Sequence, residues 1–272
     1  MNFLQFDFET QDQEQSEQLI ALLSEQGFDG FEEDGNTLLA FIPESKFDVV
    51  SFEKTLEMFS ILAYSKTELE NINWNKRWEE NFDPVVVDDF VAIRAHFHHP
   101  IKNVQHEIII TPKMSFGTGH HATTHLMIQL MRKLDISGKE VLDFGTGTGV
   151  LAILAQKLGA SKIVAIDYDE WSVTNTLENI EKNGSLGILV EQKDAVPDTG
   201  KYDIILANIN LNVILDNISA MQKIMPQGAK LLLSGLLSEN EEEVKDALKD
   251  NYFKYLSTSK RGDWIAMLAE KL

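Results

Sequence analysis

The sequence contains no cysteine. Disulfide bonds, thiolate nucleophiles and cysteine-based zinc sites are therefore all excluded. Long apolar runs are also missing, since no stretch approaches the roughly 20 apolar residues that span a bilayer. The opening MNFLQFDFET lacks the basic and apolar parts of a signal peptide. We therefore expect a soluble, cytoplasmic protein that does not bind a membrane.

Basic residues are scarce. The 272 residues include 24 Lys and Arg against 43 Asp and Glu, which gives a formal net charge of −19 and a pI near 4.7. Binding to nucleic acid phosphates needs clustered Lys and Arg, so we expect no direct contact with nucleic acid. Residues 1–70 contain 16 Asp and Glu but only 3 Lys, a net charge of −13. This asymmetry marks a separate N-terminal unit.

The N-terminal unit has the pattern of short alternating elements. NFLQFDF alternates two faces, as a half-buried strand does. An apolar-periodic helix then stops near Gly27, and the turn at 34–36 separates the two strands of a hairpin. A second helix over 47–60 and a strand over 61–69 complete the order β-α-β-β-α-β. We expect a small α+β, ferredoxin-like domain over residues 1–67.

The next segment, 68–84, has the composition of a linker. Trp74, Trp78 and Phe82 recur at a spacing of four, which predicts a helix docked by an aromatic stripe. VVVDDFVAIRAHF then predicts one strand at the start of a second domain, 85–272. From EVLDFG onward, apolar strands alternate with helices, and the last two strands should pair antiparallel at one edge. This pattern is typical of an α/β, doubly wound, mostly parallel sheet covered on both faces.

The sharpest motif is VLDFGTGTGVLAI, in which Gly145, Gly147 and Gly149 follow the strand end at Asp143. Glycines let the backbone pass close to a bound cofactor, and the following helix offers free N–H donors. The dinucleotide fingerprint needs a glycine where Val150 stands, which disfavours a nicotinamide-dependent oxidoreductase. The spacing G-x-G-x-G instead resembles the S-adenosylmethionine loop of class I (Rossmann-like) methyltransferases.

Polar residues end the strands that follow. Asp167 ends the next strand, where a carboxylate accepts the two hydroxyls of a ribose. Asp169 is the better candidate for the N-cap of the following helix. Asp194 is a weaker candidate for contact with an adenine amine. Asn208 ends the fourth strand, where an amide carbonyl can hold and orient an amine beside a transferable methyl group.

The segment SFGTGHHATTHLMIQLMRKL at 115–134 contains a glycine-flanked loop that could close over a cofactor. Thr123 or Thr124 is the predicted cap of the helix that follows. All seven histidines fall between positions 96 and 125, but no paired Asp or Glu accompanies them at metal-ligand spacing. We therefore expect no metal site.

Together FGTGHHATT, DFGTGTGVLAI, AID and ANI, behind an acidic domain and an aromatic linker, closely resemble the bacterial ribosomal protein L11 methyltransferase family. The resemblance covers nearly the whole chain. It implies an N-terminal domain that recognises a basic protein of the large ribosomal subunit and a class I domain that methylates its lysine or N-terminal amines with S-adenosylmethionine.

The resemblance also implies which residues form the site. It places cofactor contacts at Thr124, Gly145, Asp167 and Asn208, beside Gly147 of the glycine motif. Asn208 is expected to orient the amine and so to be the catalytic residue. A class I methyltransferase for RNA or a small molecule is the alternative. A non-catalytic scaffold is disfavoured by the intact glycines and Asp167.

Overall fold

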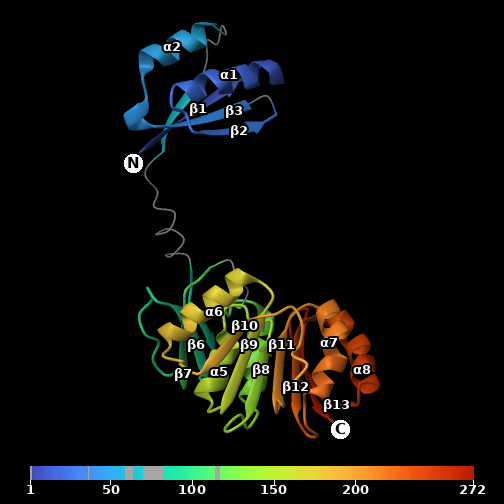
Figure 1. The fold of residues 1–272 in the computed structure, drawn as a ribbon. Coiled ribbons are helices and arrows are strands. Elements are labelled where there is room, and N and C mark those ends of the chain that lie inside the picture. Colours follow the sequence, from blue (N-terminus) through green and yellow to red (C-terminus); the bar gives the residue numbers. More distant parts are fainter. Residues whose placement is uncertain (1, 36, 59–63, 70–81, 114–116) are drawn as a thin grey trace. The chain divides into compact units, whose positions relative to one another are not determined.

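The computed structural model describes residues 2–35, 37–58, 64–69, 82–113 and 117–272. The chain divides into two compact units, Met1–Asn81 and Phe82–Leu272 (Figure 1). The buried apolar residues form separate clusters in the two units. The predicted linker helix at 68–84 lies mostly outside the described residues. In the described ranges, no helix is both long and apolar enough to cross a membrane.

The N-terminal unit is an antiparallel sheet with the strand order β2-β3-β1-β4, the ferredoxin-like order. Both helices lie on one face of this sheet (Figure 1). Leu4, Phe6 and Phe8 are buried beneath them, so the predicted alternation is confirmed. The elements are β1 (Phe3–Glu9), α1 (Gln13–Glu25), β2 (Gly30–Asp34), β3 (Thr37–Pro43), a 3-10 turn (Glu44–Lys46), α2 (Val49–Met58) and β4 (Tyr64–Leu69).

The second unit begins with a three-stranded sheet in the order β5-β6-β7. Its strands are β5 (Val85–Val87), β6 (Val91–Ala95) and β7 (His106–Ile110). The prediction of one strand from VVVDDFVAIRAHF was wrong, because Asp88 adopts a left-handed φ of 53° and turns the chain between β5 and β6. Aspartate tolerates this conformation better than most residues.

Helix α4 (Ala122–Met131) follows, and its N-cap is His121. The backbone N–H of Thr123 donates to His121 Nδ1 at 3.4 Å. The prediction of Thr123 or Thr124 as the cap was wrong, because the helix starts at Ala122 and both threonines already lie in its first turn. Met127, Leu130 and Met131 form the buried side of this helix.

The rest of the unit builds a seven-stranded sheet from described residues, in the order β10-β9-β8-β11-β12-β14-β13. It is parallel from β10 to β12, and β14 runs antiparallel to both of its neighbours. The strands are β8 (Glu140–Phe144), β9 (Lys162–Asp167), β10 (Ile188–Gln192), β11 (Ile204–Asn208), β12 (Lys230–Leu237), β13 (Phe253–Arg261) and β14 (Trp264–Lys271).

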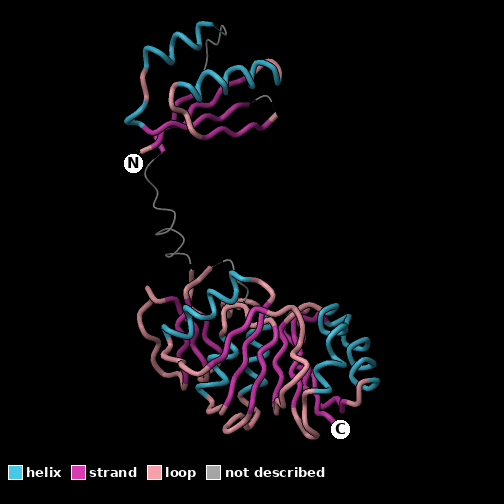
Figure 2. Tube along the Cα trace, in the orientation of Figure 1, coloured by secondary structure: helices cyan, strands magenta, loops and turns pink. Residues whose placement is uncertain are grey.

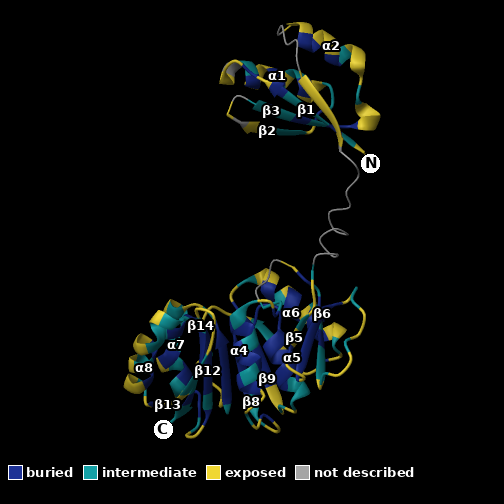
Figure 3. Ribbon diagram, turned by 180° about the vertical axis from the view of Figure 1, so that it is seen from behind, coloured by how far each residue is buried: buried dark blue, intermediate teal, exposed yellow. Residues whose placement is uncertain are grey.

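Helices cover both faces of this sheet (Figure 2). Neighbouring residues of one strand enter opposite cores: Val141 packs in the core with α4 and α5, and Leu142 packs in the core with α7 and α8. The central strands β8, β9, β11 and β12 are therefore almost wholly buried, whereas the outer strands β10 and β13 keep several exposed residues (Figure 3). The expected doubly wound fold is confirmed. Its helices are α5 (Val150–Lys157), α6 (Glu170–Lys182), α7 (Leu211–Lys223) and α8 (Glu241–Asp250), with a 3-10 turn at Ser238–Asn240.

Helix α6 ties the small sheet to the large one through asparagine side chains. Asn183 exchanges two hydrogen bonds with the backbone of Ile109, and Asn179 Oδ1 accepts from Thr111 N at 2.7 Å. The Nδ2 of Asn179 donates to Thr148 O at 2.8 Å. These amides occupy the free edge of β7 and hold the start of α5, which positions the turn after β8.

Candidate active site

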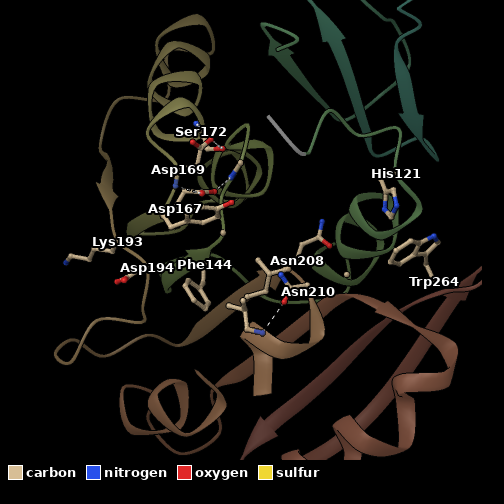
Figure 4. A pocket seen from close by; sticks show the side chains of 16 residues that line it. His121, Phe144, Asp167, Asp169, Ser172, Lys193, Asp194, Asn208, Asn210 and Trp264 are labelled. Carbon is tan, nitrogen blue, oxygen red and sulfur yellow. Dashed lines mark hydrogen bonds between the residues drawn. The ribbon is translucent and has the colours of Figure 1, made fainter. Parts of the chain in front are cut away.

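A cavity of about 640 Å³ opens at the carboxyl ends of β8, β9 and β11 (Figure 4). This is the point where the strand order reverses, which is where open α/β sheets bind ligands. Five residues predicted from the sequence line it: Gly145, Gly147, Asp167, Asn208 and the weaker candidate Asp194. The other lining residues are His121, Phe144, Tyr168, Asp169, Ser172, Lys193, Ile209, Asn210, Val213, Gly235 and Trp264.

The glycine-rich turn forms one wall. Gly145, Gly147 and Gly149 all have left-handed φ angles, of 76°, 57° and 80°. A Cβ at Gly145 would lie 2.2 Å from Ile209 Cγ2, and one at Gly149 would lie 2.9 Å from Thr176 Cγ2. Both the backbone conformation and the space therefore require glycine at these two positions.

Asp143 lies beneath this turn and is almost fully buried, with 1% of its surface exposed. It accepts the hydroxyl of Thr146 at 2.7 Å and the backbone N–H of Ala152 at 3.1 Å. Burial raises the pKa of the Asp143 carboxyl to about 7, and the charge of nearby Asp167 adds to this effect. Asp143 therefore supports the turn from below instead of lining the cavity.

Asp167 joins β9 to the turn. Its Oδ2 accepts the backbone N–H of Gly147 at 2.9 Å, and its Oδ1 accepts that of Asp169 at 3.1 Å. Each oxygen keeps a second lone pair for a ligand. Asp169 accepts the N–H groups of Trp171 and Ser172, so its prediction as the N-cap of α6 is confirmed.

Asn208 lies at the end of β11 with 8% of its surface exposed. Its Nδ2 donates to Thr124 Oγ1 at 3.4 Å, so the buried Thr124 reaches the cavity through Asn208. The Oδ1 of Asn208 is buried and has no hydrogen-bond partner among the described residues. An unsatisfied buried acceptor is costly, and a donor from a ligand would satisfy it. Next to it, Asn210 caps α7 by accepting from Val213 N (Figure 4).

Sequence reasoning missed the wall opposite Asp167. His121 from the start of α4 and Trp264 from the start of β14 line the cavity and meet edge to face, with ring centroids 4.4 Å apart (Figure 4). Burial lowers the pKa of His121, which favours its neutral imidazole. His121 lies inside the recognised GHHATT segment, but no local signal in the sequence connects Trp264 with the site.

The predicted glycine-flanked loop is described only in part, because residues 114–116 lie outside the described ranges. Its remaining part contacts the glycine-rich turn, since Thr148 Oγ1 donates to Gly117 O at 2.8 Å. Across the described residues, no group of three His, Asp or Glu side chains could hold a metal ion.

The profile of a known family, "Ribosomal protein L11 methyltransferase (PrmA)", matches residues 6–272 of this chain. The chain belongs to this family. It is 40% identical to the ribosomal protein L11 methyltransferase of Porphyromonas gingivalis over 256 residues, which cover 92% of this chain and 88% of the relative. It is 38% identical to that of Chlorobaculum tepidum over 283 residues, with coverages of 99% and 96%.

A solved structure of a member supports the same assignment. The ribosomal protein L11 methylase of Lactobacillus delbrueckii subsp. bulgaricus superposes with a TM-score of 0.65 and 29% sequence identity. The superposition covers 70% of this chain and all of that one. The family resemblance inferred from the motifs is therefore confirmed.

The buried carboxyl of Asp143 predicts how the stability of the protein depends on pH. A carboxyl with a higher pKa in the folded state holds its proton more tightly when folded. Its contribution to the free energy of unfolding is therefore full below the unfolded pKa of about 4 and is lost as the pH rises through about 7.

The variant Asp143→Asn keeps a neutral amide at this place at every pH. The free energy of unfolding of the variant minus that of the wild type should increase by about 2 to 4 kcal/mol from pH 4.5 to pH 8, because the wild type loses this contribution. Urea unfolding at several pH values measures this difference, in which the titration of other carboxylates cancels. A difference that stays constant with pH would contradict the assigned pKa.

Proposed function

We propose that this chain transfers methyl groups from S-adenosyl-L-methionine to lysine or N-terminal amino groups of ribosomal protein L11. The observation that carries the proposal is the family match over residues 6–272, which includes both units and the whole cavity. Relatives of nearly equal length bear the name of this substrate. The acidic net charge of −19 argues against RNA as the substrate.

The cavity suits the cofactor in size and in chemistry. About 640 Å³ is within the range of small-molecule sites. Asp167 offers carboxylate oxygens for the ribose hydroxyls, and Asp194 lies where an adenine amine could be contacted. Because Gly145 and Gly147 have no side chains, the backbone at these two positions can approach the cofactor closely. When bound, S-adenosylmethionine supplies an electrophilic methyl group on a positively charged sulfur.

Asn208 is the proposed catalytic residue. Its unsatisfied Oδ1 is an acceptor for an amine N–H, and its Nδ2 is held by Thr124. An amine that donates to Oδ1 has its lone pair fixed in direction, and this alignment lowers the barrier to displacement. The new C–N bond forms as the C–S bond breaks, and the electron pair of that bond stays on sulfur.

The amine must first lose a proton, because a free lysine ammonium has a pKa of about 10.4. The apolar part of the cavity, including Phe144, Ile209 and Trp264, favours the neutral amine by desolvation. Water that reaches the cavity then accepts the proton. The substrate is made by ribosomes and assembled into them, so we place the enzyme in the cytoplasm.

The N-terminal unit is the proposed docking domain for L11. Residues 1–70 carry a net charge of −13, and this negative electrostatic potential attracts a basic protein. The face of its sheet opposite the helices carries Phe3, Leu39 and Phe41, all half-buried. Asp7 and Glu32 flank Leu39 on the two neighbouring strands of the same face. No described element of the N-terminal unit covers this face, which offers an apolar centre with carboxylates beside it.

The reaction itself is tested by incubating the enzyme with purified L11 and isotopically labelled cofactor and reading the product by mass spectrometry. Transfer of label to L11 amino groups is expected. In Asn208→Ala, turnover at saturating substrates should fall at least about 100-fold, because the amine is no longer aligned. The proposal fails if L11 stays unlabelled while the same enzyme labels RNA or a free metabolite.

The role of Asp167 is tested by calorimetry with S-adenosylmethionine. Asp167→Ala removes the charge-assisted acceptor and leaves Gly147 N–H unpaired, so affinity should fall about ten- to hundredfold, or roughly 1.5 to 3 kcal/mol. Asp12→Ala is the control, since its carboxylate caps α1 in the N-terminal unit; its loss should lower stability by about 1 kcal/mol and leave the affinity unchanged. Equal affinities for wild type and Asp167→Ala would remove Asp167 from the site.

The docking role is tested by two charge reversals in the full chain. Glu9→Lys with Glu32→Lys changes the open face of the sheet, and Glu17→Lys with Glu25→Lys makes the same change of net charge on exposed positions of α1. At low salt, the open-face pair should raise KM for L11 about tenfold and the helix pair much less. Identical effects of the two pairs would leave only a general role for charge.

A further inference from the structure

Strand β12 carries a β-bulge next to the cavity. Its pairing with β14 shifts between Ser234, which faces Ala266, and Leu236, which faces Ile265. Gly235 is the extra residue, with a left-handed φ of 84°, and it lines the cavity. Bulges of this kind are common beside active sites, where they redirect the chain.

The bulge makes room for the residue that follows Asn208. A Cβ on Gly235 would lie 2.1 Å from the carbonyl oxygen of Ile209 and 2.7 Å from its carbonyl carbon. These are backbone atoms, so no side-chain rotation relieves the clash. The N–H of Ile209 donates to Ser234 O at 3.1 Å, which ties the same peptide segment to β12.

The side chain of Ile209 is held by a second glycine from another strand. A Cβ on Gly145 would lie only 2.2 Å from the Cγ2 of Ile209. Ile209 therefore occupies space that two glycines leave open, with its carbonyl group against Gly235 and its side chain against Gly145. It follows Asn208 directly in the chain.

We infer that Gly235 is a positioning residue for methyl transfer: its bulge holds the Ile209 peptide in the place that orients Asn208. The inference rests on the amine-binding role proposed for Asn208. A side chain at 235 would displace the Ile209 peptide and with it the amide of Asn208. Displacements of about 1 Å at a reacting group cost on the order of 100-fold in rate.

The chain provides a matched control. Gly228, just before β12, has a φ of 82°, nearly the same as Gly235, but a Cβ there would meet no atom within 4 Å. Alanine therefore causes the same backbone strain at both positions, and only Gly235→Ala forces a clash. A comparison of the two variants separates displacement of Ile209 from the general cost of losing a left-handed glycine.

The experiment measures kcat with L11, the Kd for S-adenosylmethionine and the melting temperature for wild type, Gly228→Ala, Gly235→Ala and Asn208→Ala. Gly228→Ala should keep wild-type kcat. Gly235→Ala should lose about 10- to 100-fold in kcat, while its Kd stays within about threefold of wild type. A merely structural role would instead lower the melting temperature and leave kcat of the folded enzyme unchanged.

Two further measurements keep the test open. If Gly235 acts through Asn208, Gly235→Ala placed in the Asn208→Ala chain should change the remaining kcat by less than about threefold. If Gly235→Ala does not fold, Ile209→Gly loosens the same peptide without adding an atom and should lower kcat about tenfold. The positioning role is overturned if Gly235→Ala turns over as fast as Gly228→Ala, if its loss is as large in the Asn208→Ala chain as in the wild type, or if Ile209→Gly keeps wild-type kcat. A fully active Asn208→Ala would instead overturn the role of Asn208 on which the inference rests.

Discussion

The hydrogen bond from Gly147 N–H to the carboxylate of Asp167 is the contact on which the site depends. It joins the ends of two neighbouring strands and fixes the backbone of a turn whose glycines all have positive φ. Because Asp143 holds the same turn from beneath, the turn is held by two acidic residues. The cavity wall is therefore set before any ligand arrives, which lowers the cost of ordering it on binding.

The two carboxylates differ in environment and in role. Asp143 is buried under the turn, where desolvation raises its pKa to about 7. It accepts its two hydrogen bonds from Thr146 and Ala152 of the protein itself. Asp167 borders the cavity and keeps acceptor capacity after its two backbone bonds. The sequence motif presents both as acidic strand ends, yet only Asp167 is available to a ligand.

Much of the fold follows from patterns that the sequence displays openly. Apolar alternation, helix periodicity and turn residues predict the element order of both units, because each reports on a local choice. The rule that ligands bind at the carboxyl ends of parallel strands brings Gly145, Asp167 and Asn208 together correctly. Thr124 was also assigned to the cofactor, and in the structure it contacts Asn208.

The features that escaped prediction have different physical origins. Trp264 reaches the cavity from the closing hairpin, and its register follows a bulge at Gly235 that no local pattern reveals. His121 replaces the threonines as a cap because the helix starts earlier than its hydroxyl residues suggest. The turn at Asp88 splits a run that is apolar on both sides. The first case depends on contacts between distant segments, whereas the cap and the turn are local choices for which the sequence allows more than one residue.

The most direct test of this account is a crystal structure of the full chain with S-adenosylhomocysteine, the cofactor product. The account predicts both ribose hydroxyls within hydrogen-bond distance of Asp167, with the Gly147 N–H still donating to that carboxylate, and the sulfur on the Asn208 side of the cavity. A ribose bound away from Asp167, or a Gly147 N–H that leaves Asp167 when the ligand binds, would contradict it.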